Sequence, residues 1–166
     1  MENATFRKKQ SIKAIELGGG QNPIIHPNAD VRKMPNVDYV IDFEQPLPFE
    51  NNTFDFVYSS YALEHISWRN VKSFVKEIYR ILKPDGKIAI VTANLLEQCK
   101  AVAASEVWSD NFSCMIFGDQ DYPENCHKSG FSPEYIEKIF SEIGFKQSKV
   151  TPLPHCTTDM LIEAEK

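Results

Sequence analysis

Residues 14–23 of the chain read AIELGGGQNP, and the interpretation of the remaining sequence starts from this stretch. Apolar residues lead into an acidic residue, and three glycines follow at once. The apolar lead predicts the end of a buried strand, and the glycines predict a tight turn where the backbone must closely approach another group. In an open α/β sheet, such a turn lies at the carboxyl edge of the first strand, where ligands bind.

The residues after the glycines narrow the class of ligand. A phosphate-cradling turn continues with Lys and then Ser or Thr, whereas this chain continues with Gln21 and Asn22. A dinucleotide-binding turn places a third glycine where Pro23 stands, and no good helix follows here. A ligand without phosphates therefore fits better, and a plain glycine-rich loop remains the alternative.

Apolar periodicity along the chain predicts alternating strands and helices, which is typical of a doubly wound α/β sandwich. Asn70 is the expected cap of the clearest helix, Ile24 and Ile25 are candidates for pairing with the sheet, and the last two strands are candidates for an antiparallel edge. The predicted strands are 12–17, 37–43, 54–60, 87–92, 146–150 and 160–164, and the predicted helical segments are 61–66, 70–83, 95–107 and 132–143.

The length of 166 residues fits one domain, which we place at 12–166 after a mobile N-terminal leader at 1–11 that has no apolar signal core. A long stretch at about 108–130, rich in Asp, Asn, Cys and aromatic residues, predicts an irregular functional loop.

Charge and composition exclude several classes of protein. Eighteen basic and 23 acidic residues give a net charge of −5, which argues against a nucleic-acid partner bound through a broad basic surface. No run approaches the roughly 18 apolar residues that a membrane span needs. The four cysteines lack zinc-site spacing and predict free thiols in a reducing, cytoplasmic location.

Acidic residues follow the glycine turn at positions that suit a nucleoside. Asp30 and Asp42 fall where strand ends are expected to meet the ligand edge, and a carboxylate there can accept two hydrogen bonds from ribose hydroxyls. Asp42 can also accept from the amine of an adenine, with Phe43 packed on the ring. The alternative is a turn aspartate that caps its own backbone. Together with Glu16, these acids favour a cationic or hydroxyl-rich ligand.

This ordered set of stretches resembles the class I S-adenosylmethionine-dependent methyltransferases over nearly the whole chain, from residue 12 to residue 164. The resemblance rests on five stretches, and the order and spacing of the last two resemble the ubiquinone-biosynthesis-like branch. The stretches are 16–20, 42–43, 47–57, 63–66 and 81–87.

The resemblance implies a three-layer Rossmann-like fold with a mostly parallel seven-stranded sheet and an antiparallel last strand. It also implies S-adenosylmethionine as cofactor and S-adenosylhomocysteine as product. Asp30 is the least close match to the family, because the segment before it is shortened. The residues expected to bind the cofactor are Glu16, Gly18 and Gly20 around its methionine part, Asp30 near the ribose, Asp42 and Phe43 near the adenine, and Ser59 at the end of the fourth strand, together with Gly19 and Asn22.

A closer resemblance concerns the acceptor of the methyl group. Residues 118–122 and 127–132 look like a small group of predicted methyltransferases that is often connected with surface-glycan pathways. The leading prediction is therefore O-methylation of a small hydroxylated acceptor, with a carbohydrate preferred. Another small molecule methylated on nitrogen or carbon, or a non-catalytic binding or partner subunit, remains open, as does a homodimer. A nicotinamide-dependent oxidoreductase is disfavoured by Pro23.

Methyl transfer is an in-line displacement, and a hydroxyl acceptor benefits from a base that removes its proton. His127, in the polar loop, is the first candidate for this base and His65 is the second, with a structural or surface role as the alternative for each. Asp119 or Asp121 could orient His127 or hold a divalent ion, but the spacing predicts no metal site.

Aromatic residues near these positions are candidates for the wall of the acceptor pocket, with core or lid packing as the alternative. They are Trp68, Trp108, Phe112 and Tyr122.

Overall fold

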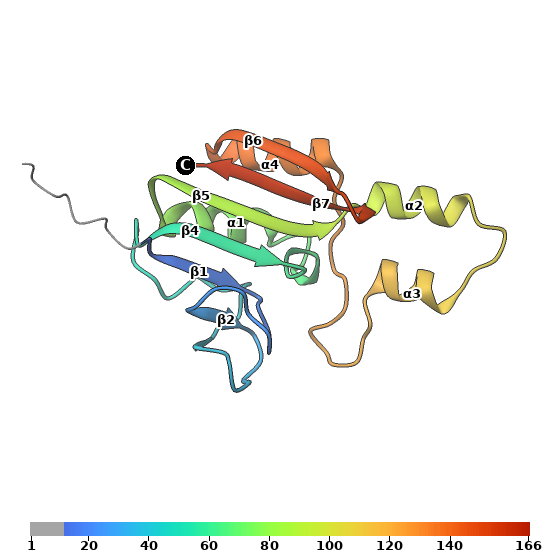
Figure 1. Ribbon diagram of the computed structural model, residues 1–166, viewed down its shortest axis with the longest axis horizontal. Helices are drawn as coiled ribbons and strands as arrows, with labels where there is room; N and C mark the ends of the chain where they lie inside the picture. The colour runs from blue at the N-terminus through green and yellow to red at the C-terminus, as the bar shows by residue number, and fades with distance from the viewer. Residues whose placement is uncertain (1–11) are drawn as a thin grey trace, which may run out of the picture.

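The computed structural model describes residues 12–166, so the predicted leader at 1–11 lies outside the described residues. One seven-stranded sheet runs through the molecule in the order β3-β2-β1-β4-β5-β7-β6 (Figure 1). Strands β1 to β5 pair in parallel, and β7 is antiparallel to both of its neighbours, which confirms the predicted sheet. The strands are β1 (Ala14–Leu17), β2 (Asn28–Asp30), β3 (Tyr39–Val40), β4 (Phe54–Ser60), β5 (Leu82–Ala93), β6 (Lys146–Leu153) and β7 (Cys156–Glu165).

Two amphipathic helices, α1 (Val71–Ile81) and α4 (Pro133–Ile143), contact each other and lie behind the sheet in Figure 1. Their buried stripes, which include Phe74 and Ile78 of α1 and Ile136 of α4, join the apolar core. Helices α2 (Leu95–Ala103) and α3 (Asp110–Phe117) lie beyond the ends of β5 and β7, and the 3-10 turn η1 (Leu63–His65) follows β4.

The two faces of the sheet are covered differently. Val57 and Ile90 lie under the helices and are completely buried, whereas Phe56 and Tyr58 alternate to the opposite face and stay partly accessible. Within residues 12–166, no helix covers that opposite face (Figure 1). The 21–36 segment, which follows the first strand, contains three prolines and forms turns on either side of β2 instead of a helix.

Several element boundaries differ from the sequence prediction. Ile24 and Ile25 do not pair with the sheet, because their backbone N–H groups donate to the Glu16 carboxylate. The predicted strand at 37–43 shrinks to the two residues of β3. Asn70 occupies the cap position of α1, but its side chain donates to Glu44 at 2.7 Å and caps nothing.

The stretch at 108–130 is not wholly irregular, because α3 forms within it. Ser109 caps this helix by accepting from the N–H of Phe112, and the Trp108 ring packs against Phe112 and Phe117. Helix α2 ends at Ala103 and is therefore shorter than the predicted 95–107.

The C-terminal half largely follows the prediction. Ser132 caps α4, and Gly144 ends it in the left-handed conformation with φ +111°. Strand β5 begins at Leu82, before the predicted start at 87. Strands β6 and β7 are longer than predicted and leave only a short turn between them. No helix in the described part of the chain has both the length and the apolar character needed to cross a membrane.

Candidate functional site

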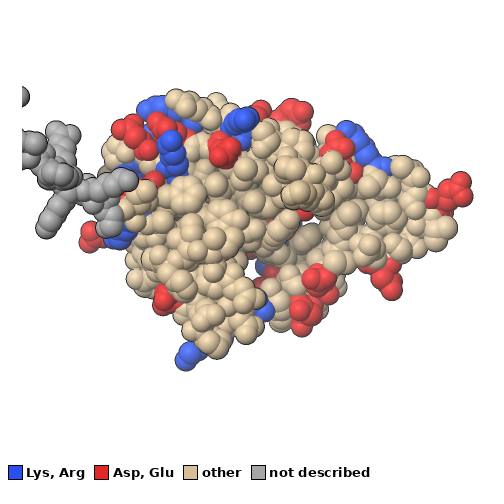
Figure 2. All heavy atoms as spheres, viewed as in Figure 1, with Lys and Arg blue, Asp and Glu red and all other residues tan. Residues whose placement is uncertain are grey.

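A cleft of about 410 Å³ opens at the carboxyl edge of β1, β2 and β4, which is where the parallel strands were expected to place a ligand. Its volume falls within the range of small-molecule sites. Figure 2 shows the surface hollowed between the body of the sheet and the lobe that carries α3. The residues that line the cleft are Gly18, Gly20, Asp30, Val31, Arg32, Asp42, Phe43, Glu44, Tyr61, Ala62, His65, Ile66, Tyr122, Glu124 and Lys128.

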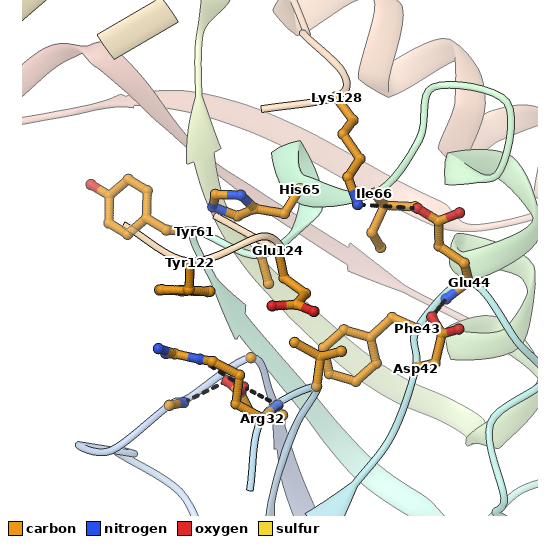
Figure 3. Close-up of a pocket in the computed structure, with 15 residues that line it drawn as sticks. Arg32, Asp42, Phe43, Glu44, Tyr61, His65, Ile66, Tyr122, Glu124 and Lys128 are labelled. Atoms are coloured by element: carbon orange, nitrogen blue, oxygen red, sulfur yellow. Dashed lines mark hydrogen bonds and ion pairs between the residues drawn. The ribbon is translucent and has the colours of Figure 1, made fainter. Parts of the chain in front are cut away.

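These residues form two walls. Residues 18–44 make the first, here called the glycine wall, and residues 61–66 with 122–128 make the second, the histidine wall. In Figure 3, Asp42 and Phe43 lie on the first wall, and His65 and Lys128 lie on the second. Two contacts link the walls: the Arg32 guanidinium lies 3.7 Å from the centre of the Tyr122 ring, and Lys128 Nζ lies 3.8 Å from Glu44 Oε1.

The glycine turn lines the cleft through Gly18 and Gly20, both with positive φ (+85° and +57°). A Cβ on Gly18 would lie only 2.4 Å from the Cβ of Ala62, so this position has room for hydrogen alone. A Cβ on Gly20 would meet no heavy atom nearer than 3.9 Å, so it would fit without a clash. Gly20 therefore provides a bare backbone surface to a ligand.

Glu16 does not line the cleft. Its side chain is 2% exposed, and Oε2 accepts from the N–H groups of Ile24 (2.6 Å) and Ile25 (2.7 Å). The carboxylate thus holds the loop after the glycines, and its direct contact with a cofactor stays a prediction. It acts as a positioning residue for that loop.

Three other residues expected at the cofactor also lie outside the cleft lining. Gly19 turns inward, where its N–H donates to Asn28 Oδ1 at 3.1 Å, and Asn22 is exposed to solvent. Ser59 is completely buried, and its hydroxyl donates to the carbonyl of Leu17 at 2.8 Å, tying β4 to β1. Gly19 and Ser59, which follow or end strands, thus make hydrogen bonds within the protein and do not face the cleft.

Asp30, Asp42 and Phe43 all line the cleft, as expected. Asp30 Oδ2 accepts from the N–H of Gly20 at 3.0 Å, so this carboxylate also fixes the glycine turn. Asp42 is exposed, and its Oδ1 accepts from the N–H of Glu44, the one side-chain bond that Asp42 makes within residues 12–166. Phe43 is almost buried and packs on Phe74 of α1.

The histidine wall brings together the two predicted catalytic histidines. His65 lines the cleft, and His127 lies against it with 5.0 Å between the ring centres. The N–H groups of Lys128 and Ser129 both donate to the carbonyl of Glu64, which holds the two chain segments together. The pair is therefore built from backbone contacts between residues more than 60 positions apart.

Burial lowers the pKa of both imidazoles. Desolvation is the largest cause for each, and for His65 the charge of His127 acts in the same direction. The backbone of Ile116 and the charge of Asp119 act in the opposite direction on the His127 pKa, but with smaller effect. Both rings are therefore neutral at pH 7 and carry a free lone pair.

Glu64 is a member of this cluster that the sequence analysis did not single out. Burial raises the pKa of its carboxyl to about 7, while the Thr92 hydroxyl, which donates to Oε2 at 2.8 Å, acts in the opposite direction. In the sequence, the position of Glu64 next to His65 is the one feature that points to a role for it. An acidic residue in a short turn gives no indication that its side chain is buried.

The acids expected to assist His127 have other partners. Asp119 accepts from the thiol of Cys114 at 2.7 Å, and Asp121 accepts from the amide of Asn125. Of the four aromatic candidates for the pocket wall, only Tyr122 lines the cleft. Trp68 is 60% exposed, Phe112 packs on Trp108, and Trp108 also packs on Phe117 of α3.

The amino-acid sequence is similar to the sequences of known methyltransferases. A family model described as a methyltransferase domain matches residues 11–90. The chain is 34% identical over 121 residues to a ubiquinone/menaquinone biosynthesis C-methyltransferase of Hydrogenovibrio crunogenus, covering 69% of this chain and 47% of that protein. It is 30% identical to a demethylmenaquinone methyltransferase of Staphylococcus saprophyticus, with 72% and 53% covered.

Solved structures agree on the fold. The structure of an S-adenosylmethionine-dependent methyltransferase from Mesorhizobium loti matches with a TM-score of 0.68 over 94% of this chain and 91% of the other, at 14% sequence identity. This likeness concerns the fold alone. The chain spans about half the length of the curated relatives it matches.

Proposed function

The chain belongs to the class I S-adenosylmethionine-dependent methyltransferases, and we propose that it transfers the methyl group of this cofactor to a hydroxyl of a small acceptor. The observation that carries the proposal is the pairing of two unlike walls across one cleft. One wall offers bare backbone and carboxylates, and the other offers neutral imidazoles.

The glycine wall suits the cofactor in three ways. Gly20 lines the cleft with backbone alone, and Asp42 keeps one carboxylate oxygen unused by the described residues, available to a nucleoside donor. The Nε of Arg32 is buried and makes no hydrogen bond among residues 12–166, and its ion pair with Asp30 Oδ1 is long, at 3.7 Å. Four acidic residues against two basic ones in the lining also favour a ligand that carries a sulfonium charge.

S-adenosylmethionine, when bound, supplies a methyl group that is activated by the positive charge on sulfur. The residues of this chain would then align an acceptor and remove its proton. His65 lines the cleft, and the His127 ring packs edge-on against the His65 ring, outside the cleft lining. We propose that this pair assists loss of the acceptor proton. His65, the second candidate from the sequence, lines the cleft and would take the proton, and His127, the first candidate, would act through its contact with His65.

The acceptor we propose first is a sugar. Its hydroxyls can bond Glu124 and Glu44 as donors and Lys128 as acceptors, so a hydroxyl-rich molecule matches this polar lining. The second candidate is a quinol-type ring methylated on carbon, which the printed names of the two relatives above favour.

An acceptor screen tests the proposal. The full chain is incubated with cofactor carrying a labelled methyl group and with nucleotide sugars, free glycans, small phenols and quinols, and labelled products are identified by mass spectrometry. We expect methyl ethers of a hydroxylated acceptor. Carbon-methylated quinols as the main product would replace the first candidate by the second. Binding of S-adenosylhomocysteine without transfer to any acceptor would point to a non-catalytic binding protein.

His155→Ala provides a control for variants of the histidine wall. His155 is exposed in the turn between β6 and β7, outside the cleft lining. Turnover that falls equally in His155→Ala and His127→Ala would contradict the proposed role of the pair.

A further inference from the structure

Glu64, His65 and His127 place one carboxylate and two imidazoles at the inner side of the histidine wall. Each residue offers one ligand atom, and these three atoms all lie within 4.8 Å of one another. Atoms bound to one tetrahedral zinc ion lie roughly 3.4 Å apart, given metal–nitrogen distances near 2.1 Å. Small rotations of the two half-buried imidazoles are enough to close this difference.

The groups around the ligands already have the arrangement of a second coordination sphere. His65 Nδ1 lies 3.2 Å from the carbonyl of Cys126, which can only accept, so Nδ1 carries the proton and Nε2 keeps its lone pair. The Thr92 hydroxyl donates to Glu64 Oε2 at 2.8 Å. A histidine that donates to a carbonyl and a carboxylate that is itself hydrogen-bonded are typical of metal ligands.

The position of the third ligand is fixed by the backbone. The N–H of His127 donates to the carbonyl of Phe117 at 3.0 Å, and the next residue, Lys128, donates to the carbonyl of Glu64 at 2.8 Å. The segment that carries His127 is therefore joined to η1 before any ligand binds, and little ordering is needed to assemble the three side chains.

We propose that Glu64, His65 and His127 bind one divalent transition-metal ion of the zinc class, with an open coordination position toward the cleft. Two imidazoles and one carboxylate suit zinc, cobalt, nickel or iron better than magnesium or calcium, which prefer all-oxygen sites. A set of three protein ligands leaves room for a further ligand, as in catalytic zinc sites.

The inference deepens the proposed function and rests on it for the role of the ion. An acceptor oxygen bound at the open position would lose its proton more readily, because the cation stabilises the alkoxide. With the ion in place, His65 and His127 would both hold it, and the acceptor proton would pass to solvent water in the open cleft instead of to an imidazole. The site would thus select acceptors that carry an oxygen able to coordinate a metal.

The test measures binding of the metal alone. The full chain is treated with chelator, and Co²⁺ is then titrated in while the visible d–d absorption is recorded, followed by competition with Zn²⁺. We expect one Co²⁺ per chain, an absorption intensity typical of four-coordination, and no charge-transfer band from a thiolate. A thiolate band would show that a cysteine, and not this triad, binds the ion, and would overturn the proposal.

Variants locate the ion within the protein. His65→Ala and His127→Ala are expected to weaken Co²⁺ binding by at least about a hundredfold, and Thr92→Val by about 10- to 100-fold through the second sphere. His155→Ala keeps the affinity of the unmodified chain. Circular dichroism confirms that each variant is folded, and Thr92→Val keeps all three ligands. No saturable binding, or equal binding in the His127→Ala and His155→Ala proteins, would refute the site.

The same samples separate this inference from the proposed function. Binding of S-adenosylhomocysteine without any Co²⁺ binding refutes the metal site alone. Binding of Co²⁺ at these residues without binding of S-adenosylhomocysteine supports the metal site and contradicts the proposed function.

Discussion

The glycine wall of the cleft comes from one continuous stretch, residues 18–44, whereas the histidine wall joins residues 61–66 to residues 122–128. In the first wall, short-range bonds set the geometry: Asp30 holds the N–H of Gly20, and Glu16 holds the loop at Ile24. In the second wall, backbone bonds from Lys128 and Ser129 to Glu64 cross more than 60 residues of chain.

Because the two walls are built differently, we expect the glycine wall to determine cofactor binding and the histidine wall to determine the rate of methyl transfer. A wall built from neighbouring residues keeps its shape when a distant side chain is changed, so cofactor affinity is expected to depend on the glycine wall alone. The histidine wall brings reactive groups together only in the folded chain, so substitutions there are expected to affect turnover. Four substitutions test this division.

Removal of the His127 imidazole is expected to have the largest effect of the four substitutions. His127→Ala is expected to reduce turnover by about a hundredfold or more, because a group that handles the acceptor proton typically contributes at least that much. Affinity for S-adenosylhomocysteine stays unchanged, since the glycine wall is untouched. Steady-state rates with labelled methyl donor, together with titration calorimetry, measure both. Loss of cofactor affinity alongside turnover would show that the walls are not independent.

Glu16→Gln tests the support of the glycine wall. Both hydrogen bonds to Glu16 reach the same oxygen, and the amide can accept them without the charge, so stability is expected to fall by about 2 kcal/mol. Urea denaturation gives the free energy of unfolding. A stability equal to that of the unmodified chain, combined with a large loss of cofactor affinity, would instead place the Glu16 carboxylate at the ligand.

Gly20→Ala tests the bare backbone surface itself. The added methyl group would lie in the cleft with no heavy atom nearer than 3.9 Å, at a backbone φ of +57° that strains an alanine. It is expected to weaken S-adenosylhomocysteine binding about tenfold, or about 1.4 kcal/mol. Gly18→Ala is the matched control: its methyl group would clash with Ala62 at 2.4 Å, so it is expected to lower stability by about 1–3 kcal/mol. Unchanged affinity in a folded Gly20→Ala protein would contradict the assignment of this surface.

Ser59→Ala is expected to have the smallest effect. It removes one buried hydrogen bond to the carbonyl of Leu17, which should reduce the free energy of unfolding by about 1 kcal/mol. Cofactor affinity should not change, because Ser59 lies outside the cleft lining. A selective loss of affinity, measured by calorimetry at equal stability, would restore the role that the sequence alone suggested.

The glycine wall was also the more predictable one. Gly18, Gly20, Asp30, Asp42 and Phe43 were all identified from the sequence and all line the cleft. Their positions follow from strand ends, and an apolar run ending in a turn reveals a strand end. The direction in which a strand-end side chain points is not encoded in the same way, so the inward orientation of Glu16 and Ser59 became evident only in the fold.

The histidine wall was predictable in part. His65 and His127 were each identified as candidates, but their contact depends on the path of residues 104–131 around the lobe. The same stretch was expected to be irregular, because its mixed polar and aromatic residues hide the capped helix α3. Glu64 was missed as a chemical group, since its burial arises from packing against β5 and Thr92, 28 positions away.

An NMR titration of the full chain with S-adenosylhomocysteine tests the central claim, that this cleft is a cofactor site, most directly. We expect saturable shifts of backbone amides concentrated at residues 18–20, 30–32 and 42–44, with smaller shifts at 61–66. No shifts at millimolar ligand, or shifts confined to surfaces away from the glycine wall, would contradict the account.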